Sequence, residues 1–228
     1  MTIVRDIFTG QTAHAFLLFT LGVAVVFAAG LPGFYAGAFA GLDTQAWFWL
    51  VVANAVVHQL FVWICWRTEL YAKGMTRLFG AAAFVLYASI FTILILARPV
   101  LVTALAVSNA GTVPLDPALG NLIAFALCVP VIYLGYSVRR FFGFRRAFGI
   151  DHFDPVYRRL PMIRGGIFRF SPNAMYVYGF MLLWIPAFYF RSTAAFVAAA
   201  FSHAYIWVHY LATEKPDMNY IYGKAGSR

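Results

Sequence analysis

Charged side chains are scarce in this sequence, and acidic ones are scarcer than basic ones. Only 11% of the 228 residues are charged, and eight acidic residues stand against seventeen basic ones. Soluble domains carry about 25% charged residues, so a soluble protein of this composition would expose large apolar patches and aggregate. The scarcity excludes an ordinary soluble domain, and the 63% of hydrophobic residues indicates a bilayer environment. We expect residues 1–228 to form a single integral membrane domain.

Cysteine is also nearly absent. The two cysteines, Cys65 and Cys128, fall inside apolar segments, where we expect them to be small buried hydrophobes. Their number and spacing exclude a disulfide framework and a zinc-type site, and we expect no metal centre. The chain also lacks an internal repeat and a glycine-rich dinucleotide fingerprint.

Six uncharged stretches are long enough to cross a membrane. A helix needs about twenty apolar residues to span about 30 Å of hydrocarbon, where open strands would leave their backbone groups unsatisfied. The sequence therefore predicts an all-α, polytopic transmembrane helical bundle of about six spans. A shorter apolar stretch, 100–107, is expected to be re-entrant, interfacial or the frayed end of the third span. The six stretches are 11–42, 44–66, 78–97, 117–138, 170–190 and 192–213.

The basic residues indicate an orientation. With the N-terminus placed in the cytoplasm, fifteen of the seventeen lysines and arginines fall in inner segments, Lys224 and Arg228 among them. Only Arg98 and Arg191 fall on the outer side. The positive-inside rule therefore predicts that both termini are cytoplasmic. The net charge of +9 then follows from topology, so we expect anionic lipid headgroups as partners and no nucleic acid.

The first thirty residues admit a second interpretation, a signal peptide with Ala28-Ala29-Gly30 near its cleavage site. The apolar run is long for a signal peptide, so we expect a retained first helix. The expected location is a bacterial inner membrane or an endoplasmic reticulum membrane, and the oligomeric state stays open.

The longest inner segment, residues 139–169, begins with alternating basic and aromatic residues. Such a run is typical of a helix that lies at the membrane surface. It serves either as a positive-inside anchor or as a cytoplasmic flap that attracts anionic lipid or a charged cosubstrate. Asp151 and Asp154 with Pro155 mark a turn in its middle, and we expect His152 to be a solvent-exposed loop residue.

A helix start follows this segment. Two glycines, the second of them Gly166, allow the backbone to approach a neighbour closely. Ser171-Pro172 predicts a helix start with a serine cap and a proline in the first turn, where free N–H groups favour a carboxylate. Asn173 and Tyr176 are three residues apart and share a face. The plainer alternative is a well-capped span with an interfacial tyrosine.

The last span has more polar residues than packing requires. One stripe of this helix carries His203, Trp207, Tyr210 and Glu214. His209 lies on a neighbouring face. Polar groups at membrane depth are costly and usually face a cavity or a partner, although aromatic belts and helix–helix hydrogen bonds account for some of them. A stripe that ends in a carboxylate at the inner edge favours a functional role for Glu214.

The second span contains two polar residues four positions apart, Asn54 and His58, on the face that also carries Phe61 and Cys65. One interpretation is helix–helix hydrogen bonding inside the bundle. The other is a wall of the pocket that holds an acceptor substrate.

Two motifs near the C-terminus resemble those of a known superfamily. The first runs from Gly166 to Tyr176 (GIFRFSPNAMY), and the second, about forty residues later, runs from Thr213 to Gly223 (TEKPDMNYIYG). Together they resemble the membrane-bound phospholipid and isoprenylcysteine methyltransferase superfamily, in particular its phosphatidylethanolamine N-methyltransferase branch. The resemblance covers residues 139–228 and marks them as a methyltransferase-like part with the donor site.

The resemblance implies S-adenosylmethionine (SAM) as methyl donor, bound at the cytoplasmic face by the last two spans and the C-terminal segment. A membrane lipid, of the phosphatidylethanolamine type, is the implied acceptor. The implied donor-binding residues are Gly166, Asn173, Tyr176, Glu214, Tyr222 and Gly223.

Methyl transfer is an in-line displacement that needs alignment and a neutral nucleophile. A lipid amine is protonated in water, so a base must take its proton, and the candidates are Glu214 and His209. Tyr210 is a third candidate catalytic residue. Together with Tyr176 and Trp207 it offers aromatic faces that stabilise a sulfonium or a methylated ammonium by cation–π attraction. For acceptor binding we expect His58, Asn54, Trp207 and His203.

Other functions stay open. A carboxyl methyltransferase of a prenylated or other lipid-like acceptor would need no base. A sterol-type membrane reductase has a similar last hairpin, but it would bind a nicotinamide cofactor, for which the chain shows no fingerprint. A non-enzymatic transporter would line a path with polar residues from both sides, whereas here they gather in the second span and at the inner ends of the last two.

Overall fold

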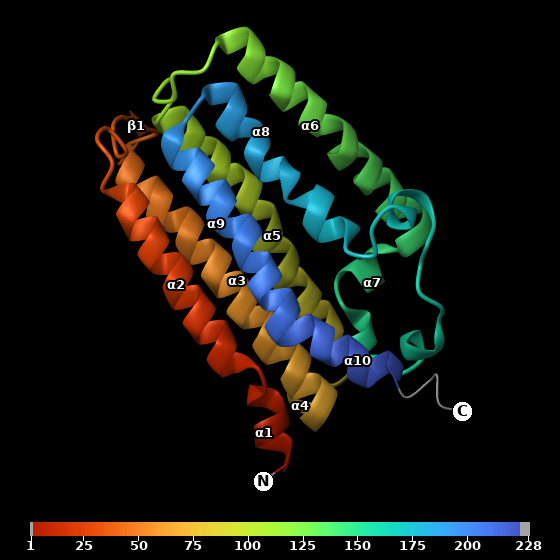
Figure 1. The fold of residues 1–228 in the computed structure, drawn as a ribbon. Helices are drawn as coiled ribbons and strands as arrows, with labels where there is room; N and C mark the ends of the chain where they lie inside the picture. Colours follow the sequence, from red (N-terminus) through yellow and green to blue (C-terminus); the bar gives the residue numbers. More distant parts are fainter. Residues whose placement is uncertain (1, 224–228) are drawn as a thin grey trace.

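The computed structural model describes residues 2–223, which form a bundle of long helices (Figure 1). Lys224 and Arg228, which entered the count of basic residues, lie outside the described residues. Five helices are long and apolar enough to cross a membrane, so the predicted all-α fold class is confirmed. They span Ile3–Ala29, Thr44–Ala72, Gly74–Ser108, Pro117–Phe142 and Thr193–Gly223.

The N-terminal half contains three long helical segments joined by short turns. Asp43 caps the second of these segments, because its carboxylate accepts a hydrogen bond of 2.7 Å from the Ala46 N–H. A two-stranded antiparallel hairpin precedes that cap. The elements are α1 (Thr2–Phe8), α2 (Gln11–Ala29), β1 (Ala38–Phe39), β2 (Leu42–Asp43), α3 (Thr44–Ala72), α4 (Gly74–Phe79), a 3₁₀ turn (Gly80–Ala82) and α5 (Ala83–Ser108).

The C-terminal half alternates long helices with short irregular turns, three of which are π-helical. Asp116 caps α6 through the Leu119 N–H at 3.0 Å, and Ser192 caps α9 through the Ala195 N–H at 3.1 Å. The helices are α6 (Pro117–Ser137), α7 (Phe144–Ala147), α8 (Met181–Phe190), α9 (Thr193–His209) and α10 (Lys215–Gly223). The π turns are Val138–Phe142, Met175–Gly179 and Tyr210–Glu214, and the 3₁₀ turns are Ile150–His152, Tyr157–Arg159 and Gly166–Arg169.

The bundle has two distinct ends, which we name by their elements. At the hairpin end lie β1, the start of α6 and the end of α8; at the α10 end lie α1, α4, α7 and α10 (Figure 1). Both ends of the described chain are at the α10 end. The predicted cytoplasmic side corresponds to the α10 end, and this orientation stays a prediction.

The core is built around α9, which carries small residues where it meets its neighbours. Four alanines of α9 are fully buried and pack against large apolar residues of α3 and α5. Small side chains let helices approach closely in a membrane, where van der Waals contact replaces the hydrophobic drive. The four are Ala194, Ala195, Ala198 and Ala199.

Two predicted features of the spans differ from the structure. The stretch 170–190 forms a shorter helical unit, Met175–Phe190, because an irregular capped turn occupies the residues before it. The stretch 100–107 is neither re-entrant nor interfacial, since α5 continues through Pro99 to Ser108. The alternative that joined this stretch to the third span is therefore the correct one.

The basic and aromatic run that opens residues 139–169 is not one surface helix. It divides at Gly143, whose φ of 85° lies in the left-handed region that ends a helix. The first part continues α6 as a π turn, and the second part is the single turn α7. The Asp154 turn is confirmed, because its carboxylate accepts a hydrogen bond of 2.9 Å from the Val156 N–H.

Candidate functional site

A cavity of about 1080 Å³ begins at the α10 end and extends into the bundle. Ligand sites of proteins commonly measure about 300–1,000 Å³, so this one has room for a cofactor together with part of a second molecule. Its walls come from α3, α5, α6, α8, α9, α10 and the segment 142–183. Most of the lining is apolar, and the polar side chains among it include His58, Gln59, Arg98, Arg146, Asp151, Asn173, His209 and Glu214.

The π turn Tyr210–Glu214 brings two of the predicted catalytic residues to this cavity. The Lys215 N–H bonds to the Tyr210 carbonyl, an i to i+5 pattern that widens the helix. His209 and Glu214 are five residues apart, which in an α-helix points them to different faces, but both line the cavity here. Sequence periodicity placed His209 beside the functional stripe, and the π turn moves it into the same wall.

Neither of these side chains is fully satisfied by the protein. Both ring nitrogens of His209 and the Oε2 atom of Glu214 are buried and have no hydrogen-bond partner within residues 2–223. A buried polar group left unpaired costs about 1–3 kcal/mol. Both side chains lie in the cavity wall, where a bound molecule can reach them.

Three aromatic rings form the wall next to them. The Tyr176 ring packs edge-to-face against two other rings. Its centroid lies 5.7 Å from that of Tyr210 and 5.9 Å from that of Trp207. Tyr176 and Tyr210 line the cavity, whereas Trp207 lies behind them and supports both rings. The two tyrosines thus present an aromatic surface to the cavity.

Asn173 lies in a turn just before the π turn Met175–Gly179. The Ser171 hydroxyl accepts a hydrogen bond of 3.2 Å from the Asn173 N–H, so the serine closes this turn. The N-cap position of the helix itself is Ala174, which forms no side-chain cap, so the predicted serine cap of the helix is wrong. The Asn173 carbonyl in turn accepts hydrogen bonds from the N–H groups of Tyr176 and Val177, which begin the π turn. Asn173 and Tyr176 both line the cavity, so the predicted shared face exists.

Gly166 has a packing role in the structure. Its φ is +61°, and a Cβ atom there would lie 2.5 Å from the Ser137 hydroxyl and 2.9 Å from the Phe141 ring. The close neighbour of this glycine is therefore the end of α6, and Gly166 is not among the lining residues. The adjacent Ile167 N–H donates to the Ser137 hydroxyl at 3.0 Å, which fixes the loop against α6.

Tyr222 lies outside the cavity but contacts two residues of its wall. Its hydroxyl donates a short hydrogen bond to the Asp151 carboxylate and accepts one of 3.3 Å from Arg146. Asp151 and Arg146 line the cavity, whereas Tyr222 and Gly223 do not. Gly223 is exposed, with open space around its Cα.

The predicted acceptor residues are dispersed. His58 lines the cavity, but Asn54, Trp207 and His203 do not. The Nδ1 atom of His203 instead accepts a hydrogen bond of 3.2 Å from the Trp184 indole N–H, a link between α9 and α8. Of the four, only His58 is brought to the cavity that holds Glu214.

The position of Arg98 differs most from the predicted topology. The sequence placed it on the outer side, yet it lies inside α5, is 2% exposed and lines the cavity beside His58. Counting basic residues treats each arginine as a marker of a span end, and this one is within a span. Ionisable residues inside apolar spans are rare and commonly line substrate or ion pathways, so the position of Arg98 within the apolar span is a signal that the sequence already carries.

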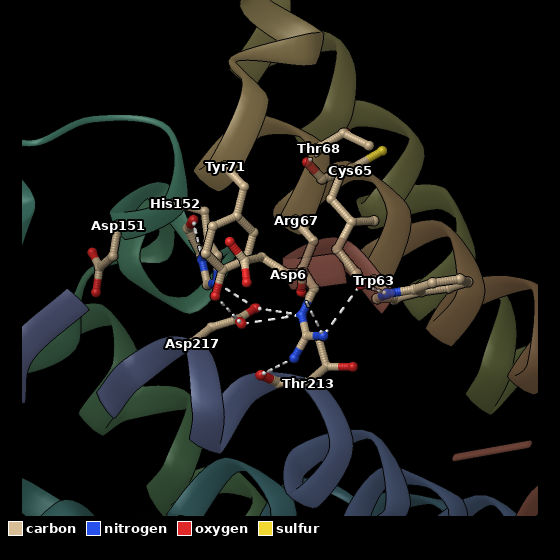
Figure 2. A network of polar contacts seen from close by, with 12 residues as sticks. Asp6, Trp63, Cys65, Arg67, Thr68, Tyr71, Asp151, His152, Thr213 and Asp217 are labelled. Carbon is tan, nitrogen blue, oxygen red and sulfur yellow. Dashed lines mark hydrogen bonds and ion pairs between the residues drawn. The ribbon is translucent and has the colours of Figure 1, made fainter. Parts of the chain in front are cut away.

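A buried ionic network holds α10 against α3 (Figure 2). The Arg67 Nε donates to the Asp217 carboxylate at 3.1 Å, and both side chains are almost completely buried. The Arg67 guanidinium also donates to backbone carbonyls of α1, the turn after it and the π turn, including Ile7, Thr9 and Ala212. One side chain therefore ties the first, second and last helical segments together.

His152 completes this network and corrects a second prediction. It was expected to be solvent-exposed, but it is fully buried, with its Nε2 3.5 Å from Asp217 Oδ2 (Figure 2). Its ring stacks on Trp66 at 4.1 Å between centroids. Gly149 permits this stack, because a Cβ there would lie 2.3 Å from the Trp66 ring. Local turn signals showed the bend at this loop, but only the folded bundle shows what covers it.

Residues 119–225 match the family model described as phospholipid methyltransferase. The match begins within α6 and covers both motifs, so it confirms the resemblance drawn from them and implies a methyltransferase enzyme. Together with the five apolar helices it indicates an integral membrane protein. No curated protein and no solved structure matches the chain significantly.

Proposed function

We propose, from the phospholipid methyltransferase match over residues 119–225, that this protein transfers a methyl group from SAM to the amine of a membrane lipid of the phosphatidylethanolamine type. The reaction would occur at the cytoplasmic membrane interface. The observation that carries the proposal is the cavity in which the matched segment places Asn173, Tyr176, His209 and Glu214 together. Two of these side chains have polar atoms that no group of residues 2–223 satisfies.

The residues at the α10 end of the cavity fit the chemistry of SAM. When bound, SAM supplies an electrophilic methyl group on a sulfonium centre. The unpaired Glu214 Oε2 would accept a hydrogen bond from the donor's α-amino group, a charge-assisted contact. The faces of Tyr176 and Tyr210 would attract the sulfonium by cation–π interaction. Tyr222 and Arg146 would hold Asp151 in place at the same end of the cavity.

The acceptor amine must lose a proton before it attacks, and on this proposal His209 would take it. Its ring nitrogens have no protein partner within the described residues, and it lines the same cavity as Glu214. With Glu214 engaged by the donor, His209 is the better candidate for the general base. Proximity and alignment of the two substrates would supply most of the remaining rate enhancement.

The test is SAM binding by calorimetry to the detergent-solubilised protein, with wild type compared to Glu214→Gln. The variant removes one charge without changing shape, and we expect SAM affinity to fall about tenfold or more, the value of a charge-assisted hydrogen bond. Asp43→Asn is the matched control, because it also removes one carboxylate but lies at the hairpin end and keeps its capping oxygen. Thermal midpoints of all three proteins establish that they are folded.

A labelled methyl donor then identifies the acceptor. Product from phosphatidylethanolamine that keeps its label in alkali is an N-methylated lipid, whereas label released by alkali indicates a methyl ester and the carboxyl methyltransferase alternative. If well-folded wild type binds no SAM in the presence of lipid, the methyltransferase proposal is wrong.

A further inference from the structure

Arg98 is an unpaired cation inside the bundle. It lies fifteen residues from the start of α5 at Ala83, about 22 Å along the helix axis. Its Nη2 donates to the Ala55 carbonyl at 3.3 Å and to His58 Nδ1 at 3.0 Å, and its guanidinium lies 5.4 Å from the Phe180 ring centroid. Its Nε and Nη1 atoms are buried and have no hydrogen-bond partner within residues 2–223.

Among the described residues, no acidic side chain forms an ion pair with this guanidinium. An arginine stays protonated in proteins, so the side chain carries its charge at this depth. None of the ion pairs formed by the described residues includes Arg98, and its contacts are a carbonyl, an imidazole and an aromatic ring. A buried charge without an ionic partner is costly, and arginines at membrane depth typically mark substrate sites. The missing negative charge is therefore expected from a ligand.

The cavity around Arg98 suits the polar end of a lipid. Beside the guanidinium its walls are apolar and aromatic, with Ile95 on α5 and Phe180 before α8. Val131 and Gly135 of α6, which we call the α6 rim, also line the cavity, and Gly135 is exposed. A largely apolar cavity lined by two membrane-spanning helices suits a molecule that enters from the bilayer.

The same cavity contains Arg98 and the residues proposed to bind SAM. His58, Arg98, His209 and Glu214 all line it. In a phosphoethanolamine headgroup the phosphate and the amine are separated by two carbons, so a phosphate held at Arg98 keeps the amine inside the cavity that His209 also lines.

We propose that Arg98, supported by His58, binds the phosphodiester of the acceptor lipid. This inference rests on the proposed function for the identity of the acceptor. Arginine is suited to this role, because its N–H groups form charge-assisted hydrogen bonds with phosphate oxygens. The apolar walls and the α6 rim favour a lipid over free phosphate or the carboxylate of SAM as the source of the anion.

The test measures binding without requiring methyl transfer. Delipidated protein in a neutral detergent is titrated with phosphatidylglycerol, which has the phosphodiester but no amine, with diacylglycerol, which has neither, and with inorganic phosphate. The proteins are wild type, Arg98→Gln, Arg98→Lys and the control Arg77→Gln, which removes an exposed arginine of α4 outside the cavity.

We expect phosphatidylglycerol to bind Arg98→Gln about tenfold or more weakly than wild type, Arg98→Lys to retain part of the affinity, and Arg77→Gln to bind as wild type does. Diacylglycerol affinity should be the same in all four proteins, and inorganic phosphate should not compete. Equal phosphatidylglycerol affinity in wild type and Arg98→Gln would overturn the inference. If Arg98→Gln does not fold, Arg98→Lys is compared with wild type. The inference is then overturned if the ratio of phosphatidylglycerol affinity to diacylglycerol affinity is the same in both proteins.

Two further outcomes separate the possible anions and the two proposals. If Arg98→Gln binds SAM more weakly but phosphatidylglycerol as wild type does, the guanidinium binds the donor's carboxylate and the inference is overturned. Competition between inorganic phosphate and phosphatidylglycerol for the wild-type protein would also overturn it. Arg98-dependent phospholipid binding in a protein that transfers no methyl group would support the inference and refute the proposed function. If Arg98→Gln methylates phosphatidylethanolamine at the wild-type rate, the proposed function is supported and the inference about Arg98 is refuted.

Discussion

The ion pair between Arg67 and Asp217 makes the sharpest prediction about stability. In Asp217→Asn the Arg67 guanidinium keeps its carbonyl partners but loses the only carboxylate with which it is paired in the described residues. Both side chains are at most 1% exposed, so solvent does not screen the loss. Removal of one partner from such a pair typically costs about 3–5 kcal/mol.

The expected readout is a lower thermal midpoint. For a chain of this size each 1 kcal/mol shifts the midpoint by about 2–4 °C, so we expect a fall of about 6 °C or more for Asp217→Asn. SAM affinity should fall as well, because α10 carries Lys215, Met218 and Asn219 of the cavity wall. Tryptophan fluorescence during heating measures the midpoint, and Asp43→Asn at the hairpin end controls for the loss of a carboxylate.

A double-mutant cycle decides whether the pair itself is responsible. Arg67→Met combined with Asp217→Leu removes both charges, so the double variant should be more stable than the sum of the single effects predicts. A coupling energy below about 0.5 kcal/mol would refute the reasoning, because it would mean that the two charges act independently. Unchanged stability of Asp217→Asn would refute it directly.

Two further substitutions distinguish packing from chemistry. Gly166→Ala places a Cβ 2.5 Å from the Ser137 hydroxyl at a residue with positive φ. We therefore expect a lower thermal midpoint, with SAM affinity preserved in the folded fraction. Lost SAM affinity at an unchanged thermal midpoint would instead assign Gly166 to the donor site. His209→Gln should reduce the rate of methyl transfer about 10²–10⁴-fold with little change in SAM affinity, measured with a labelled donor; an unchanged rate would leave Glu214 as the base.

The sequence was sufficient for features that depend on local composition. Uncharged stretches located the long helices. These predictions succeed because each depends on the composition of one segment. The structure also brings the motif residues Asn173, Tyr176 and Glu214 to one cavity, and their binding roles stay a prediction.

The failures have one physical origin, which is contact between distant segments. His152 looks exposed because charged and turn residues surround it, yet Trp66 and Asp217 cover it from other helices. Arg98 looks like the end of a span because arginine is rare inside one. His209 looks misaligned because periodicity assumes 3.6 residues per turn, which the π turn at Tyr210–Glu214 interrupts.

The distribution of the site over the chain suggests how its two substrates are recognised. The matched segment 119–225 contains Asn173, Tyr176, His209 and Glu214, the residues that the proposed function assigns to SAM and to the transferred proton. His58 and Arg98 lie on α3 and α5, before that segment. On this proposal the donor site belongs to the part of the chain that matches the family, and the phosphate site belongs to the part that does not. Both sites line the same cavity, in which a lipid amine held by its phosphate would face the methyl group.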